Sequence, residues 1–149
     1  MKIKPSNSEM CVQLISCMLI LLWVYAAVSK LISYEQSRMQ MMNQVFPASI
    51  NGVLLWAVPF TELLISGLLL FPGTRKVGLF LSAILLFLFS GYVLLVMLNV
   101  FGRIPCSCGG VISKLNWEQH LVFNLVFLLL ALLGFGIELK KGGLMREGK

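Results

Sequence analysis

The sequence predicts an all-α integral membrane protein, folded as an antiparallel four-helix bundle with both termini in the cytoplasm. Of the 149 residues, 58% are hydrophobic and 12% are charged, whereas soluble domains carry about 25% charged residues. The apolar residues form four runs of membrane-spanning length, and the short connections between them make consecutive helices antiparallel neighbours. No stretch is long or polar enough for a second domain. We therefore expect one membrane domain over residues 1–149, with spans at about 11–33, 51–71, 77–100 and 117–139.

The basic residues predict the orientation of this bundle. Those in the two tails and in the turn after the second run are Lys2, Lys4, Arg75, Lys76, Lys140, Lys141, Arg146 and Lys149; those in the other connections are Lys30, Arg38, Arg103 and Lys114. Because basic residues gather on the cytoplasmic side, both termini are expected there. In a bacterial inner membrane, the segment 101–116 then faces the periplasm, where a disulfide persists. The net charge of +6 does not indicate nucleic-acid binding, since no basic patch is interleaved with aromatic residues.

The first run, 11–33, has two interpretations. Basic residues precede it, and the small pair Ala26–Ala27 is compatible with a signal-peptide cleavage site. The run nevertheless continues at full membrane length through Ile32 and contains the bulky Trp23. These features favour a permanent membrane span.

Residues 34–50 form the most polar interior segment. Its first part, Tyr34–Arg38, is expected to continue the first helix out of the membrane. The apolar residues that follow are expected to form one face of a helix lying on the membrane surface, which Pro47 ends: Met39, Met41, Met42, Val45 and Phe46. Thioether sulfur also suits Cu(I), so the three methionines are a metal-binding candidate beside their ordinary role as an apolar face.

The second run contains Pro59 and Glu62. A carboxylate within a span is costly and normally faces the bundle interior with a partner, and Pro59 leaves a nearby backbone carbonyl without its usual donor. Lys30, late in the first run, is the nearest basic candidate in depth. Three roles stay open for Glu62: a structural ion pair, a proton relay, and a contact to a quinone head group. The turn Pro72–Thr74 separates this run from the third.

Cys106 and Cys108 lie in the segment between the third and fourth runs, after Pro105 and before Gly109–Gly110. Basic residues on both sides favour the reactive thiolate. A disulfide between residues i and i+2 requires a bent chain, and strain in so small a ring suits exchange rather than permanent cross-linking. The sequence therefore favours a redox dithiol, with a stapled loop and metal ligation as the alternatives.

Three polar or aromatic residues mark one face at the start of the fourth run. Trp117, His120 and Asn124 are spaced i, i+3 and i+7, which places them in one stripe of a helix. His120 is the single histidine of the chain and is a candidate for transferring the proton that thiol exchange requires. Asn124 would lie about one turn deeper, where it can hold the imidazole or a ligand oxygen. The alternative is an interfacial Trp and His of no chemical role.

The remaining cysteines, Cys11 and Cys17, lie in the cytoplasmic half of the first span. A helical rise of about 1.5 Å per residue places them roughly a bilayer's width from the outer loop. We expect them to behave as small apolar residues, unpaired with the cysteines of the loop.

Together these residues resemble the DoxX-like superfamily of small four-span membrane proteins, and most closely its methylamine-utilisation MauE branch. The resemblance rests on Ser29–Leu31 closing the first run, on Pro59 with Glu62, on Cys106–Gly110 and on the stripe that starts at Trp117. It covers most of the chain. After the cysteines, many members continue with Gly-Phe-Gly, and Gly110–Val111 departs from that pattern.

The resemblance implies a four-helix bundle in the inner membrane that takes part in periplasmic thiol–disulfide handling. Such proteins are similar to partners of thioredoxin-fold proteins, and MauE is linked to the maturation of a disulfide-rich dehydrogenase subunit. The bundle is also similar to those of membrane disulfide-forming enzymes that pass electrons to quinone, although a shared fold does not establish a shared function.

The leading hypothesis is a membrane thiol–disulfide oxidoreductase in which Cys106 and Cys108 cycle between dithiol and disulfide with the help of His120. No motif demands a cofactor; a quinone near Trp117, Asn124 and Glu62 is a candidate, and no residue is assigned to a metal. The first alternative is a non-enzymatic membrane scaffold or assembly subunit whose cysteines only staple their loop. The second is a copper- or zinc-handling protein that uses both cysteines, His120 and the methionines.

Overall fold

The computed structural model describes residues 7–42, 48–100 and 116–147. All regular structure in these segments is α-helical. The helices are α1 (Asn7–Ile32), α2 (Tyr34–Met42), α3 (Ala48–Leu70), α4 (Arg75–Met97) and α5 (Trp117–Glu147).

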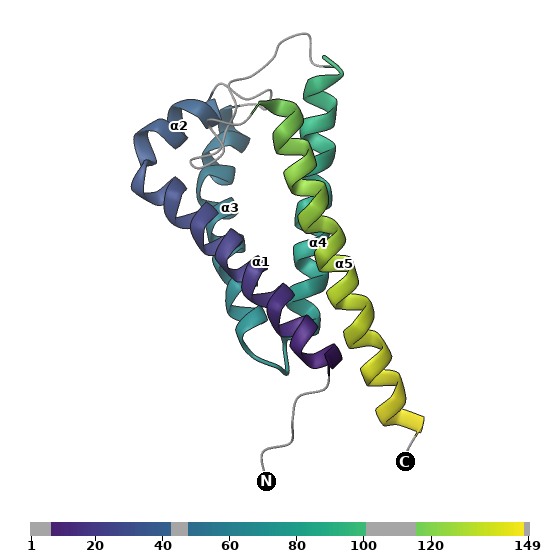
Figure 1. Cartoon of the computed structure of the whole chain (residues 1–149). Coiled ribbons are helices and arrows are strands. Elements are labelled where there is room, and N and C mark those ends of the chain that lie inside the picture. Colours follow the sequence, from purple (N-terminus) through teal and green to yellow (C-terminus); the bar gives the residue numbers. More distant parts are fainter. Residues whose placement is uncertain (1–6, 43–47, 101–115, 148–149) are drawn as a thin grey trace.

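Four of these helices are long and apolar enough to cross a membrane, namely α1, α3, α4 and α5. Consecutive long helices run in opposite directions, and α1 begins at the same end of the bundle at which α5 ends (Figure 1). We call this end the termini end, and the end at which α4 stops and α5 starts the loop end. The chain is thus a multi-pass membrane protein with an all-α bundle, as its composition predicts.

The bundle consists of two closely packed helix pairs. α1 packs against α3 and α4 packs against α5, while α3 with α4 and α1 with α5 complete the ring. The two pairs lie closest toward the termini end and diverge toward the loop end (Figure 1). Large apolar side chains are exposed around the outside of all four long helices, which suits a surface surrounded by lipid.

The apolar core fills the half of the bundle toward the termini end. In α1 it uses positions spaced three or four residues apart, which form one face of a helix: Val12, Ile15, Leu19 and Trp23. The other helices contribute Ile65, Leu69, Leu79, Ala83, Leu86 and Ala131. A buried hydrogen bond crosses this core, because the indole Nε1 of Trp23 donates to Ser82 Oγ at 3.0 Å.

The α3–α4 connection is a tight turn at the termini end. The hydroxyl of Thr74 donates to the Leu68 carbonyl at 2.8 Å, and the backbone N–H of Arg75 donates to the Phe71 carbonyl at 2.9 Å. Gly78 then lies directly against Leu69, since a Cβ at Gly78 would stand 3.0 Å from the Leu69 backbone nitrogen. This close approach holds α3 and α4 together just after the turn.

The helix ends differ from the expected span limits for identifiable reasons. α4 stops at Met97, before the expected 100, because Asn99 takes a left-handed conformation with φ 53°. The N–H groups of Asn99 and Val100 donate to the carbonyls of Val96 and Leu95 at 3.0 and 3.2 Å, which is a Schellman ending. α5 continues beyond 139 and α1 begins before 11, because polar residues extend both helices past their apolar parts.

The short helix α2 packs against α3 rather than lying apart from the bundle. The chain turns at Ser33 between α1 and α2. The rings of Tyr34 and Trp56 lie 5.5 Å apart and join α2 to α3. Of the expected apolar face, Met39 and Met42 are exposed. Its other expected members, Met41, Val45 and Phe46, lie outside the residues whose side chains the structure describes.

Candidate functional site

The interior of the bundle changes character along its length. Toward the termini end it is the apolar core described above. Toward the loop end, the residues described include a group of buried or partly buried polar side chains on all four long helices, which we call the polar tier: Lys30, Asn51, Glu62, Ser90, His120 and Asn124. Polar groups inside a membrane bundle are costly and normally mark a function, so the polar tier is the candidate functional site.

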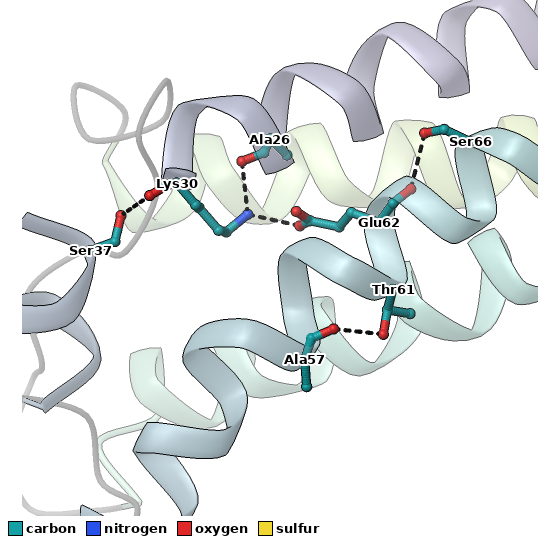
Figure 2. A network of polar contacts seen from close by, with 7 residues as sticks. All are labelled: Ala26, Lys30, Ser37, Ala57, Thr61, Glu62 and Ser66. Carbon is teal, nitrogen blue, oxygen red and sulfur yellow. Dashed lines mark hydrogen bonds and ion pairs between the residues drawn. The ribbon is translucent and has the colours of Figure 1, made fainter. Parts of the chain in front are cut away.

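Two members of the polar tier, Lys30 of α1 and Glu62 of α3, form an ion pair (Figure 2). The ammonium of Lys30 donates to Glu62 Oε1 at 2.7 Å. It also donates to the Ala26 carbonyl at 3.3 Å, in the last turns of α1, where the helix dipole favours a positive charge. The stem of Lys30 thus reaches inward from the end of α1, as the difference in depth between the two residues requires.

The two partners are buried to different degrees. The Glu62 side chain is 1% exposed, whereas that of Lys30 is 21% exposed. Only Oε1 of the carboxylate is engaged, because Oε2 is buried and has no hydrogen-bond partner among the residues that the structure describes. One turn farther along α3, the hydroxyl of Ser66 donates to the Glu62 backbone carbonyl at 3.0 Å. Glu62 therefore keeps one acceptor oxygen free inside the bundle.

The stripe at the start of α5 supplies the facing polar groups. Trp117 and His120 are partly buried, and Asn124 is 4% exposed. The ammonium of Lys30 is close enough to interact electrostatically with the imidazole of His120. Asn124 lies one turn deeper, and its Nδ2 is a buried donor with no acceptor within the described parts of the chain. The structure thus places His120 near the ion pair and Asn124 in the interior.

The two cysteines on which the redox hypothesis depends, Cys106 and Cys108, lie outside the described residues. The other two, Cys11 and Cys17, are free thiols exposed on the outside of α1 near its start. The described residues that flank the cysteine segment are Val100, just after α4, and Asn116, just before α5. The backbone N–H of Asn116 donates a hydrogen bond to Gln119 Oε1 at 3.1 Å. This hydrogen bond lies at the start of α5, next to His120 in the sequence.

No group of three or more His, Cys, Asp or Glu side chains that would suit a metal ion occurs among residues 7–42, 48–100 and 116–147. Met39 and Met42 are exposed on α2, and the side chain of Met41 lies outside the described set. The metal hypothesis, which depends on the cysteines, therefore stays a prediction.

Sequence reasoning missed two members of the polar tier. Asn51, at the start of α3, is 2% exposed, and Ser90 of α4 is 6% exposed. An Asn at the start of a span or a Ser within one is common and does not by itself indicate burial. The sequence held one signal: Asn51 shares a helix face with Glu62, and Ser90 shares one with the core residues of α4. Only the packing of the helices shows that these faces are buried.

A comparison with protein families matches residues 8–137 to the family described as methylamine utilisation protein MauE. The match runs from the first turn of α1 into α5 and so includes the whole polar tier. No curated protein and no solved structure matches the chain significantly. The family resemblance inferred from the motifs is thereby confirmed at the level of MauE, and the wider DoxX-like placement stays a prediction.

Proposed function

The chain belongs to the MauE family of methylamine utilisation proteins, and from this premise we propose that it is a membrane thiol–disulfide redox protein. Cys106 and Cys108 would exchange electrons with a periplasmic thioredoxin-like protein or with a maturing client protein. The observation that carries the proposal is the position of these two cysteines in the sequence. They lie between α4 and α5, and so in the segment that joins these helices at the loop end, where His120 and the polar tier are found.

The exchange itself needs only groups of this chain and of the partner. The thiolate of one cysteine attacks a disulfide of the partner, which forms a mixed disulfide and releases one partner sulfur as a thiolate. The second cysteine then attacks the mixed disulfide, so that the Cys106–Cys108 bond forms and the partner leaves as a dithiol. Two electrons pass to the partner. The reverse sequence oxidises the partner, and the relative reduction potentials decide the direction.

His120 is proposed to handle the protons of this exchange. The attacking sulfur must lose a proton and the leaving sulfur must gain one, and a positioned imidazole does both near neutral pH. Its place in the first turn of α5, partly buried and next to the charge of Lys30, supports this role. The imidazole is carried by a rigid helix rather than by a loop, so its position is independent of the redox state of the sulfurs.

The location follows from the distribution of the basic residues. We propose the inner membrane of a bacterium, with the termini end in the cytoplasm and the loop end facing the periplasm. The exposed Lys76 and Lys140 and the partly buried Arg75 and Lys141 lie toward the termini end, as expected for a cytoplasmic face. A wider kinship with DoxX-like proteins is part of the same proposal.

Trapping of mixed disulfides tests the function. In a protein that keeps one of the two loop cysteines, the intermediate with the partner cannot be resolved and accumulates. We expect Cys106→Ser or Cys108→Ser to yield an adduct that a reductant dissolves, and the double variant to yield none. Cys11→Ser with Cys17→Ser is the matched control and should leave the adduct unchanged, since these thiols lie at the other end of the bundle.

Two results would contradict the proposal. Full function of the double Cys106→Ser, Cys108→Ser variant, without adducts from either single variant, would identify a scaffold. Stoichiometric copper or zinc in the purified protein, with both loop thiols deprotonated, would identify a metal-handling protein.

A further inference from the structure

Two buried polar atoms of the polar tier lack a complementary group. Glu62 Oε2 is a carboxylate acceptor without a donor, and Asn124 Nδ2 is an amide donor without an acceptor, among the residues that the structure describes. Leaving such a group unsatisfied is costly, and more so when it is charged. The pairing of one free acceptor with one free donor suggests a bound molecule that offers both kinds of group.

Repeated thiol exchange requires an acceptor for two electrons and two protons, and the described protein groups do not provide one. When a dithiol becomes a disulfide, two electrons and two protons leave it. Cys11 and Cys17 cannot form a second couple for the loop cysteines, because they are exposed on the outside of α1, in the half of that helix toward the termini end. A repeated cycle therefore needs either a second protein or a carrier of two electrons and two protons that reaches the bundle from the lipid.

We propose that the polar tier binds the head group of a quinone or quinol. This inference deepens the proposed function and rests on it, because it names the carrier that the dithiol would use. A quinone takes up two electrons and two protons to become a quinol, which balances the conversion of one dithiol to one disulfide. Glu62 and Asn124 are the residues that touch the head group.

The two free atoms together fit the quinol form of such a ring, and Asn124 alone fits the quinone form. A quinone carbonyl accepts a hydrogen bond from Asn124 Nδ2, and a quinol hydroxyl donates one to Glu62 Oε2. The two residues are carried by different helices, α3 and α5, on either side of the interior. A quinol carries one hydroxyl at each of two opposite ring positions, and so offers one group to each of these residues.

Lys30 acts as a positioning residue in this site. Its ammonium holds Oε1 of Glu62 at 2.7 Å, which leaves Oε2 as the oxygen available to a ligand. The same charge interacts with His120, so the head group would lie close to a residue proposed to move protons. The apolar outside of the four helices gives a lipid-soluble molecule its approach to the bundle.

Quinone binding to the purified full chain tests the inference. The protein is reconstituted into lipid nanodiscs free of quinone and titrated with a short-chain ubiquinone or menaquinone analogue. Quinones quench indole fluorescence, so we expect saturable quenching of the tryptophan emission. Trp117 of α5 is expected to report the binding, because it lies three residues before His120 of the polar tier. Asn124→Val should weaken quinone binding about tenfold, as expected for the loss of a buried hydrogen bond. Glu62→Gln should weaken binding of the corresponding quinol, measured by its competition with the quinone, by about the same factor.

The chain offers a matched control for the first substitution. Glu9 also pairs with a lysine of another helix, Lys141 of α5, at 3.5 Å, but it does so at the termini end. Glu9→Gln should therefore leave both quinone and quinol binding unchanged. If Glu62→Gln does not fold, the double variant Lys30→Met with Glu62→Met keeps the interior neutral and should lose binding in the same way.

The outcomes separate this inference from the function on which it rests. Cys106→Ser with Cys108→Ser should bind quinone like the unchanged protein, since the polar tier contains neither cysteine. Quenching that does not saturate, or quinone and quinol binding that is unchanged in the Asn124 and Glu62 variants, would overturn the inference. Trapped mixed disulfides together with that result would leave the thiol exchange in place.

Discussion

Lys30 and Glu62 carry opposite charges inside a bundle whose other interior half is apolar. Their 2.7 Å contact joins α1 to α3, and the near-complete burial of Glu62 makes the pair sensitive to the loss of either partner. Replacing a buried ion pair by apolar residues is often neutral, whereas removing one partner leaves an uncompensated charge. The two kinds of variant should therefore differ sharply.

This contrast gives a prediction for stability. Lys30→Met alone should destabilise the bundle by about 3–5 kcal/mol, and the double variant Lys30→Met, Glu62→Met should recover most of that loss. Unfolding of the purified protein in mixed micelles by a denaturing detergent measures both. Lys141→Met is the control, because its pair with Glu9 is half-exposed and such pairs contribute about 1 kcal/mol or less. Equal losses for the single and the double variant would show that the charge of Glu62 is compensated without Lys30.

Single residues also show what sequence reasoning can and cannot find. The pairing of Lys30 with Glu62 was predictable, because a charged residue within a membrane span is rare and needs a partner nearby. The hydrogen bond from Trp23 to Ser82 was not, since a serine in an apolar run can satisfy its hydroxyl on its own helix, as Ser90 does on the Leu86 carbonyl. Only the packing of α1 against α4 decides between these two possibilities.

At the scale of helices, the apolar runs predict the four long elements well and their ends less well. Hydropathy marks the part of a helix that lies in lipid, so it does not register the polar turns at the start of α1 and the end of α5. The end of α4 depends instead on Asn99 and its left-handed backbone. The packing of α2 on α3 depends on the contact of Tyr34 with Trp56, which joins residues from two segments and leaves no periodic pattern in either.

The contact of α3 with α4 gives a prediction at this scale. Gly78→Ala should destabilise the protein by about 1–3 kcal/mol, because its Cβ would press on the backbone and side chain of Leu69 at the turn. Gly136→Ala of α5 is the matched control, since nothing lies within 4 Å of its Cβ position. That change should be neutral or stabilise by up to about 1 kcal/mol, the helix preference of Ala over Gly.

Detergent-induced unfolding of the two glycine variants measures this difference. Equal stability of Gly78→Ala and Gly136→Ala would contradict the prediction. It would mean that Gly78 and Leu69 lie farther apart than the structure shows.

At the scale of the whole molecule, the arrangement of the helices places the start of α1, the end of α5 and the α3–α4 turn at one end of the bundle (Figure 1). The end of α4 and the start of α5, which flank the cysteine segment in the sequence, lie at the other end (Figure 1). This arrangement makes the sidedness of the bundle testable with a thiol reagent that does not cross membranes. Cys106 and Cys108 should react in intact cells whose periplasm is accessible, because the basic residues predict that the loop end faces outward.

A cysteine at the opposite end provides the control. Gly73, exposed in the α3–α4 turn with nothing within 4 Å of its Cβ position, can be changed to Cys in a chain whose four native cysteines are replaced by Ser. It should react only after the cells are lysed. The reverse pattern, with Gly73→Cys labelled in intact cells and Cys106 only after lysis, would invert the orientation and remove the redox hypothesis with it.

The ion pair also has a consequence for how the protein is made. α1 precedes α3 in the chain and so leaves the ribosome before it, and the contact between Lys30 and Glu62 joins the two helices. A carboxylate delivered alone to the bilayer centre costs about 2.5–3.5 kcal/mol on translocon scales. Because α1 is already inserted when α3 emerges, its lysine can receive that carboxylate at the moment of insertion. The hairpin of α4 and α5 is then added to a pair of helices that has already neutralised its own charge.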